Sequence, residues 1–221
     1  MDKGERMTNK ELSPVAAYTE KLRDDAIRAF KDHHLIEDDR VNGKWFLARK
    51  YEDGSTRGDM ATEIISLRNG RLFVGGDIDD CVFAYFGGHR DATPEQKSVG
   101  KVAWIGNHEG FGYIQEKAGI GMTDNGKLTE CWDGDIAIAQ LKILMNDIAG
   151  EDLSEAEFTK KMEILEEAID LCDDGGERLM RHLWDNLDGD EMESYYDIGQ
   201  VISPRVMYAW AACRRLCELI L

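Results

Sequence analysis

The sequence predicts an α+β protein: an N-terminal helix packed on a mainly antiparallel sheet, followed by a C-terminal helical part. Three observations support this prediction. An amphipathic segment starts at Ser13-Pro14, an Asn69-Gly70 turn signal lies between two apolar runs, and from Phe111 onward apolar residues recur every three to four positions. Strands grouped before helices, rather than alternating with them, are typical of α+β folds.

The N-terminal segment is predicted to be a flexible arm over residues 1–12 and then a helix that ends near His33. Ser13-Pro14 supplies an N-cap and a first-turn proline. Apolar residues follow at helical spacing: Val15, Tyr18, Leu22, Ala26, Ala29 and Phe30. His33 and His34 would lie at the helix C-terminus, where the dipole favours positive charge. Adjacent helical residues point about 100° apart, so this pair is not expected to bind one metal ion.

Strands are predicted over Lys44–Tyr51, Glu63–Leu67 and the wholly apolar Cys81–Phe86, which is typical of a central or doubly covered strand. The Gly- and Asp-rich residues 52–59 are predicted to be a turn region. Lys101–Ile105 is predicted to be a further strand or the start of a helix.

The Asn69-Gly70 pair favours a two-residue type I′ loop, because both positions then need positive φ. In that register one hairpin face carries four apolar side chains: Leu67 opposite Leu72, and Ile65 opposite Val74. Ser66 and Phe73 would share the other face. Arg68 and Arg71 would lie opposite each other, which is tolerable only if they are exposed or flanked by carboxylates.

The C-terminal part is predicted to be helical over Tyr113–Gly119, Trp132–Ile148, a segment from the Ser154 and Glu157 capping box to Cys172, Glu177–Asn186, and Ser203-Pro204 to Leu219. The core face of the second helix would hold Ile136, Ala139 or Gln140, Ile143, Leu144 and Ile148. The third would bury Phe158, Met162, Leu165 and Ile169. We therefore predict an α+β domain over residues 13–122 and an acidic helical part over residues 123–221.

Negative charge is concentrated in one third of the chain. The formal net charge is −17, and residues 147–197 hold 18 Asp and Glu against 4 Lys and Arg, a net of −14. Such a segment lacks the basic footprint that nucleic acid requires, but it suits a basic surface on another protein. The predicted partner-binding residues are Glu163, Glu166, Glu167, Asp170, Asp173, Asp174, Asp188 and Asp190. The alternative is a solvated helix face that only aids solubility.

Three carboxylates, Asp77, Asp79 and Asp80, follow a predicted strand, and hard oxygen donors of this kind suit Mg²⁺ or Ca²⁺. The alternative is a turn in which Asp77 caps local amides and the other two are solvated. His108 and Glu109, in a Gly-rich loop, could supply an acid or a base, or could be exposed loop residues.

Other motifs argue against catalysis. The Asp185–Asp190 segment resembles a calcium loop, but its register puts Trp184 at the first position and Tyr195 at the twelfth, where carboxylates are required. Walker A, GxGxxG, HExxH and GxSxG motifs are all missing from the sequence. A non-enzymatic protein without a cofactor is therefore favoured.

The expected cellular location of the protein follows from its cysteines and from its hydropathy. Five scattered cysteines in apolar segments are typical of reduced, packed thiols, and Cys213 and Cys217 are expected in a helix core rather than at a metal. The sequence holds no apolar run of membrane-spanning length, and Met1–Lys10 is unlike a secretory signal. We expect a soluble, cytoplasmic protein that binds no membrane.

Asn69–Phe86, Val102–Gly106 and Tyr113–Gly121 together resemble a group of bacteriophage-encoded proteins of unassigned function. The shared pattern is G-x-L-x-V-x-GD, then VF, then VxWIG and an EKA-type helix, and it covers roughly residues 30–122. This resemblance implies a phage origin, hence a bacterial host cell, and it implies no particular activity.

Two main hypotheses follow. In the first, a non-enzymatic phage protein binds and inhibits a host protein with a basic surface, as an anti-CRISPR-like inhibitor whose acidic surface mimics nucleic acid. In the second, a small metal-dependent hydrolase or nucleotide-processing enzyme is centred on the Asp77–Asp80 turn. A third possibility is a phage structural or assembly factor. The oligomeric state is left open.

Overall fold

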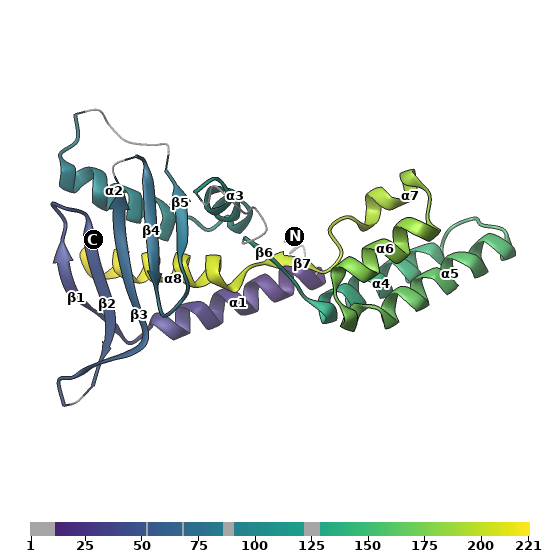
Figure 1. The fold of residues 1–221 in the computed structure, drawn as a ribbon, viewed down its shortest axis with the longest axis horizontal. Helices are drawn as coiled ribbons and strands as arrows, with labels where there is room; N and C mark the ends of the chain where they lie inside the picture. The colour runs from purple at the N-terminus through teal and green to yellow at the C-terminus, as the bar shows by residue number, and fades with distance from the viewer. Residues whose placement is uncertain (1–11, 52, 68, 86–90, 122–128) are drawn as a thin grey trace, which may run out of the picture. The chain divides into compact units, whose positions relative to one another are not determined.

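The computed structural model describes residues 12–51, 53–67, 69–85, 91–121 and 129–221 (Figure 1). Its helices are α1 (Pro14–Phe30), α2 (Pro94–Gly106), α3 (Phe111–Gly121), α4 (Gly134–Ile148), α5 (Glu155–Asp170), α6 (Gly176–Asn186), α7 (Gly189–Met192) and α8 (Pro204–Ile220). Its strands are β1 (His33–Asp39), β2 (Lys44–Lys50), β3 (Thr56–Leu67), β4 (Arg71–Gly76), β5 (Cys81–Ala84), β6 (Glu130–Trp132) and β7 (Gln200–Ile202). Two short 3₁₀ turns are η2 (Cys172–Asp174) and η3 (Glu193–Tyr195).

The chain divides into two compact units. One contains residues 1–20 and 132–201 and is called the helical unit below, and the other contains residues 21–131 and 202–221 and is called the sheet unit. One boundary falls within α1, and the other two fall within β6 and β7, which pair as a two-stranded sheet. The sheet unit is therefore discontinuous in sequence, because the C-terminal helix α8 belongs to it.

The sheet unit is built on an antiparallel sheet with the strand order β1-β2-β3-β4-β5 (Figure 1). Residues from α1, α2, α3 and α8 join one face of this sheet in a single core: Ala26, Phe30, Trp45, Leu47, Ile64, Leu72, Val74, Phe83, Val102, Ile105, Ile114 and Trp210. The N-terminal helix thus packs on the sheet, and the predicted α+β class is confirmed.

The β3–β4 hairpin differs from the predicted register by one residue. Leu67 pairs with Arg71, and Ile64 pairs with Val74. The loop therefore spans three residues, and Gly70 has φ +74° while Asn69 is not among the described residues with positive φ. A slip of one residue exchanges the faces of a strand. Consequently Ile64 is buried instead of Ile65 and Leu67, and the predicted pairing of Leu67 with Leu72 is wrong.

The predicted arginine pair across this hairpin also fails. Arg71 lies opposite Leu67 and Ala84. Arg68 lies outside the described residues.

Strand β1 replaces the predicted end of the first helix. His33 is the first residue of β1 and is fully buried, while His34 is exposed, because successive strand residues point to opposite faces. The His33 ring lies 4.7 Å from the Phe30 ring, and its Nε2 is 3.2 Å from the Met60 carbonyl. The predicted helix-terminal role of these histidines is wrong.

Two other strands and one helix differ from prediction. β3 starts at Thr56, so part of the expected 52–59 turn region is strand. β5 is an edge strand rather than a central one, and its apolar character comes from packing against α3 and α8. Lys101–Ile105 is the second half of α2, whose start is fixed by a capping box between Thr93 and Gln96.

The helical unit has its own core, built from α4, α5, α6 and the segment that follows α6. Its buried residues include Ala137, Leu141, Ile164, Leu165, Ala168, Leu179, Leu183, Met192 and Ile198. The Ser154 and Glu157 capping box at the start of α5 is confirmed. The buried face of α4 is rotated around the helix axis from the predicted one: Ala137 and Leu141 are buried, while Ile143, which was expected in the core, is 44% exposed.

Candidate functional site

The acidic residues of α5 form one continuous face on the side opposite its core. Glu163, Glu166, Glu167 and Asp170 are all exposed, and at 100° per residue they fall within about a quarter of the helix circumference. The buried residues of the same helix, Ile164, Leu165 and Ala168, lie on the other side. We call these four carboxylates the α5 acidic face.

Most of this face has no compensating cation. Within the described part of the chain, Glu163, Glu166 and Asp170 form no ion pair, and neither does Asp173 of η2. Glu167 lies 3.9 Å from Nε2 of His182. The α5 acidic face therefore presents largely unbalanced negative charge.

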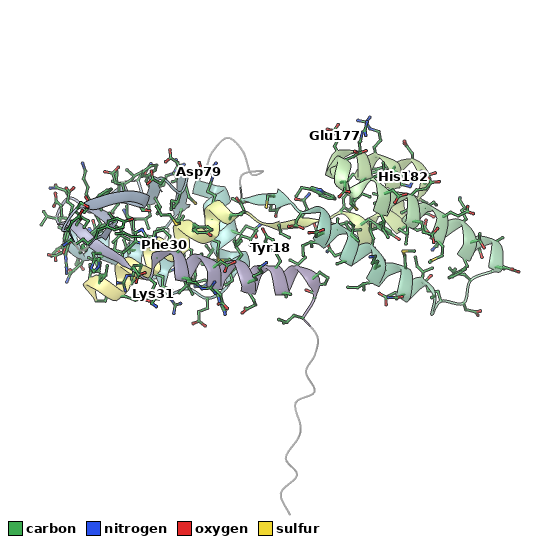
Figure 2. The ribbon with its side chains drawn as sticks, turned by 90° about the horizontal axis from the view of Figure 1, so that it is seen from below. Tyr18, Phe30, Lys31, Asp79, Glu177 and His182 are labelled. Carbon is green, nitrogen blue, oxygen red and sulfur yellow. The ribbon has the colours of Figure 1, made fainter. Side chains whose placement is uncertain are left out.

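His182 does not act as a full counter-charge for Glu167. Its Nε2 lies 3.0 Å from the Ile164 carbonyl, which can only accept, and its Nδ1 lies 3.4 Å from the Asn186 amide nitrogen. This pattern fits the neutral tautomer, with the proton on Nε2. Nε2 thus joins α6, from which His182 projects (Figure 2), to α5, while Nδ1 contacts Asn186 one turn further along α6 itself.

Three cations of the helical unit are paired with carboxylates outside the α5 acidic face. Lys161 Nζ lies 2.7 Å from Glu191, and the hydrogen bond to Glu191 raises the pKa of Lys161. Arg178 pairs with Asp174, and Arg181 pairs with Glu177, each four residues apart on or next to α6. The two arginine pairs are exposed, and each contributes little to stability. Lys142 and Lys160 form no ion pair among the described residues, so none of these five cations neutralises the α5 acidic face.

The eight predicted partner-binding residues do not form one stripe. Asp173 and Asp174 are exposed on η2, next in the chain after α5. The Asp188 carboxylate instead caps α7, where it accepts a hydrogen bond from the Glu191 amide at 2.9 Å. Asp190 lies within α7, and its side chain is outside the described set.

Sequence reasoning missed an exposed aromatic pair in the helical unit. Trp184 is 50% exposed, Tyr196 is 52% exposed, and their rings meet edge to face at 5.9 Å. Exposed Trp and Tyr are enriched among the residues that dominate binding energy at protein interfaces. The sequence did hold a sign of this pair: Trp184 lies on the polar side of α6, away from Leu179 and Leu183, the buried residues of that helix.

The Asp77–Asp80 turn sends its carboxylates to different partners. Asp77 accepts from the Ala61 amide at 3.0 Å, and its own amide donates to the Ala61 carbonyl. Asp79, labelled in Figure 2, has φ +65° and lies 3.8 Å from Arg205. Asp80 is exposed. Asp77 thus fastens the turn to β3, as the turn interpretation expects.

His108 and Glu109 have surroundings of their own. The His108 ring lies 4.6 Å from the Tyr113 ring, at an interplanar angle of 44°, and the His108 backbone carbonyl accepts from the Trp210 indole at 2.9 Å. Glu109 is exposed. Across the residues that the structure describes, His, Cys, Asp and Glu form no group of three or more that could hold a metal ion.

The cysteines are free thiols. Cys213 and Cys217 lie in the core of the sheet unit, as expected, and burial raises the pKa of both, to about 11 for Cys217. Burial also raises the pKa of Cys81 to about 12. Among the described helices, none combines the length and the apolar character needed to cross a membrane.

Comparisons with family models, with curated proteins and with solved structures found no match. Function is therefore inferred from the residues of this chain alone.

Proposed function

We propose that the chain is a non-enzymatic phage protein that binds and inhibits a host protein, with the α5 acidic face docked on a basic, nucleic-acid-binding surface. One observation carries this proposal. Four exposed carboxylates share the side of α5 that faces away from its core, and among the described residues no lysine or arginine forms an ion pair with any of them.

The spacing of these charges supports imitation of a nucleic-acid strand. A helix rises 1.5 Å per residue, so Glu163 to Asp170 span about 10 Å and place about one charge every 3.5 Å. One strand of DNA carries one phosphate about every 3.4 Å along the axis. A protein surface built to bind phosphates at that spacing would therefore find comparable charges on α5.

The proposed partner is a host protein whose nucleic-acid site is occupied by this face. In a phage protein, a nucleic-acid-dependent defence system of the bacterial host, such as a CRISPR effector, is the target class that best fits this chemistry. Carboxylates exposed at the rim of an interface act mainly through steering and are weakened by salt. Trp184 and Tyr196 are proposed to supply apolar contact in the same complex.

Capture from a host lysate with matched charge variants tests the proposal. The test variant carries Glu163→Gln, Glu166→Gln, Glu167→Gln and Asp170→Asn. The control removes four other exposed carboxylates from the sheet unit: Glu37→Gln, Glu63→Gln, Asp91→Asn and Glu109→Gln. Both variants change net charge by four, so only the position of the charge differs.

We expect the wild type and the control to retain the same partner and the test variant to lose it. If each carboxylate contributes about 0.4 kcal/mol, within the range for exposed charge pairs, the four together change affinity by at least about tenfold. Equal retention by the test and control variants would overturn the proposal. We do not propose the metal-dependent hydrolase, since the described carboxylates and histidines are not gathered as a metal site.

A further inference from the structure

A cationic pocket lies in the sheet unit, and none of the candidate site residues described above lines it. It has a volume of about 500 Å³ and lies between one side of α2, the end of β3 and the turn that joins β1 to β2. Figure 1 shows α2 beside these strands. Its polar lining includes Asn42, Ser66, Lys97, Ser98 and Lys101. This volume falls in the range of small-molecule sites.

Lys101 is the unusual member of this lining, because a lysine is almost never buried without a charged partner. Its side chain belongs to a residue that is only 8% exposed. The ammonium donates to the Ser66 hydroxyl at 3.0 Å and to the Leu67 carbonyl. Both acceptors are neutral, so two of three N–H groups are used and the positive charge is not balanced.

No carboxylate of the described residues compensates Lys101. Burial lowers its pKa, and no acidic group acts in the opposite direction. Asp39, three residues before the lining residue Asn42, is held by Asn42, whose side-chain amide nitrogen donates to it at 2.7 Å. Asp39 does not line the pocket. A buried ammonium of this kind is stabilised by an external anion.

Two hydroxyls beside the ammonium can donate to such an anion. Ser98 is 8% exposed and lines the pocket, and its hydroxyl has no hydrogen-bond partner in the described part of the chain. Ser66 accepts from Lys101, so its own hydroxyl hydrogen is available. Lys97, one turn before Lys101 on the same side of α2, adds a second positive charge at the pocket.

We propose that this pocket binds a phosphate monoester, with the phosphate held by Lys101, Ser98 and Ser66. A phosphate monoester is an anion at pH 7, and it presents three acceptor oxygens. Three donors face it in the pocket: the remaining N–H group of Lys101 and the hydroxyls of Ser98 and Ser66. A carboxylate has only two oxygens for these three donors. The remaining volume accommodates the group that is esterified to the phosphate.

The approach of Ser98 and Ser66 to the β1–β2 turn depends on the missing side chain at residue 43. A Cβ at Gly43 would lie 2.6 Å from the Ser98 hydroxyl and 2.7 Å from Cβ of Ser66. Gly43 also has φ +67°, which a side chain strains. The two serines thus converge at this glycine.

Amide NMR shifts of the full chain, titrated at constant ionic strength, test the proposal. The probes are inorganic phosphate, adenosine 5′-monophosphate and acetate. We expect saturable shifts for the two phosphate probes at Gly43, Ser66 and Ser98, and weaker, non-saturating changes with acetate. Tighter binding of the nucleotide than of phosphate would show that the ester group uses the rest of the pocket.

Two substitutions and one control make the result specific. Lys101→Gln is expected to weaken phosphate binding at least tenfold, and Ser98→Ala about three- to tenfold, as for loss of one hydrogen bond. Lys50→Gln removes an exposed charge from β2 and is expected to change nothing. If Lys101→Gln fails to fold, Ser98→Ala still tests whether phosphate binds in this pocket. Unchanged affinity in the pocket variants, equal binding of acetate, or no saturable shift with either phosphate probe would overturn the proposal.

Discussion

The contact between α2 and α8 predicts that Gly106→Ala destabilises the sheet unit. A Cβ at Gly106 would lie 2.8 Å from the Arg214 amide nitrogen and 2.8 Å from the Cys213 carbonyl group. These atoms belong to the backbone of α8, which cannot rotate away as a flexible side chain can. Because α2 and α8 both contribute to the core of the sheet unit, the added methyl group must push the two helices apart.

The magnitude follows from two opposing effects. Overpacking of a well-packed contact costs about 1–3 kcal/mol. Alanine favours a helix over glycine by about 1 kcal/mol in a helix interior, but Gly106 is the last residue of α2, so little of this gain applies. We expect a net loss of about 1–3 kcal/mol, or a fall in melting temperature of about 2–12 °C for a chain of this size.

Gly100→Ala on the same helix is the matched control. A Cβ at Gly100 meets no atom within 4 Å, and the residue lies in the interior of α2. The same chemical change is therefore expected to stabilise the protein by about 0.5–1 kcal/mol. Differential scanning calorimetry measures both variants, and the two shifts should have opposite signs.

A Gly106→Ala variant as stable as the wild type would refute the close approach of the two helices. Destabilisation by Gly100→Ala would refute the open space beside that position. The first result would mean that α8 does not lie against the end of α2 as described.

Three further predictions concern other parts of the chain. Gly199→Ala should destabilise the helical unit by more than Gly175→Ala, as measured by calorimetry. Both residues have positive φ, +70° and +99°, but a Cβ at Gly199 would lie 2.5 Å from the Trp132 ring, whereas a Cβ at Gly175 would meet no atom within 4 Å. Ser154→Ala should cost about 0.5–2 kcal/mol in urea unfolding by removing the α5 cap. Hydrogen bonds from Ser154 lower the pKa of Glu157. Their contribution to stability is therefore present above the pKa of Glu157 in the unfolded chain and is lost as pH falls through its pKa in the folded protein. The stability difference between the wild type and Ser154→Ala should accordingly shrink in acid, and a difference that grows in acid would contradict the prediction. Iodoacetamide should label half-buried Cys131 in the folded protein. It should reach the other four cysteines only after unfolding, because burial raises the pKa of each: Cys81, Cys172, Cys213 and Cys217. Rapid labelling of Cys81 in the native protein would show that strand β5 is not packed.

The sequence allowed the fold class to be predicted, because helix caps and apolar periodicity act locally. The α5 capping box and the start of α8 at Pro204 are examples. The hairpin register was not predictable from Asn69-Gly70, since the same pair fits a three-residue loop with only Gly70 at positive φ. Strand β1 was missed because the two residues between Phe30, the last apolar residue of the helical pattern, and His33 include no Gly or Pro to mark the end of the helix.

For the candidate sites, the acidic residues of α5 were visible in the sequence, but the pairing of the cations near them was not. Spacing alone placed Glu163 and Asp170 on one face. The pairing of Lys161 with Glu191 depends on a contact between separate elements, α5 and α7, which spacing along the chain does not reveal. The pocket beside Lys101 was missed for a related reason: its walls come from three segments, and residues 101–105 were not assigned to a helix.

Competition with nucleic acid tests most directly whether the α5 acidic face occupies a nucleic-acid site. A partner captured from the host lysate is purified, and its binding to this protein is measured with increasing amounts of duplex DNA and with the α5 variant. We predict that DNA and this protein exclude each other, and that neutralising Glu163, Glu166, Glu167 and Asp170 weakens binding at least tenfold. Simultaneous binding of DNA and this protein, or unchanged affinity of the α5 variant, would contradict the proposed mimicry.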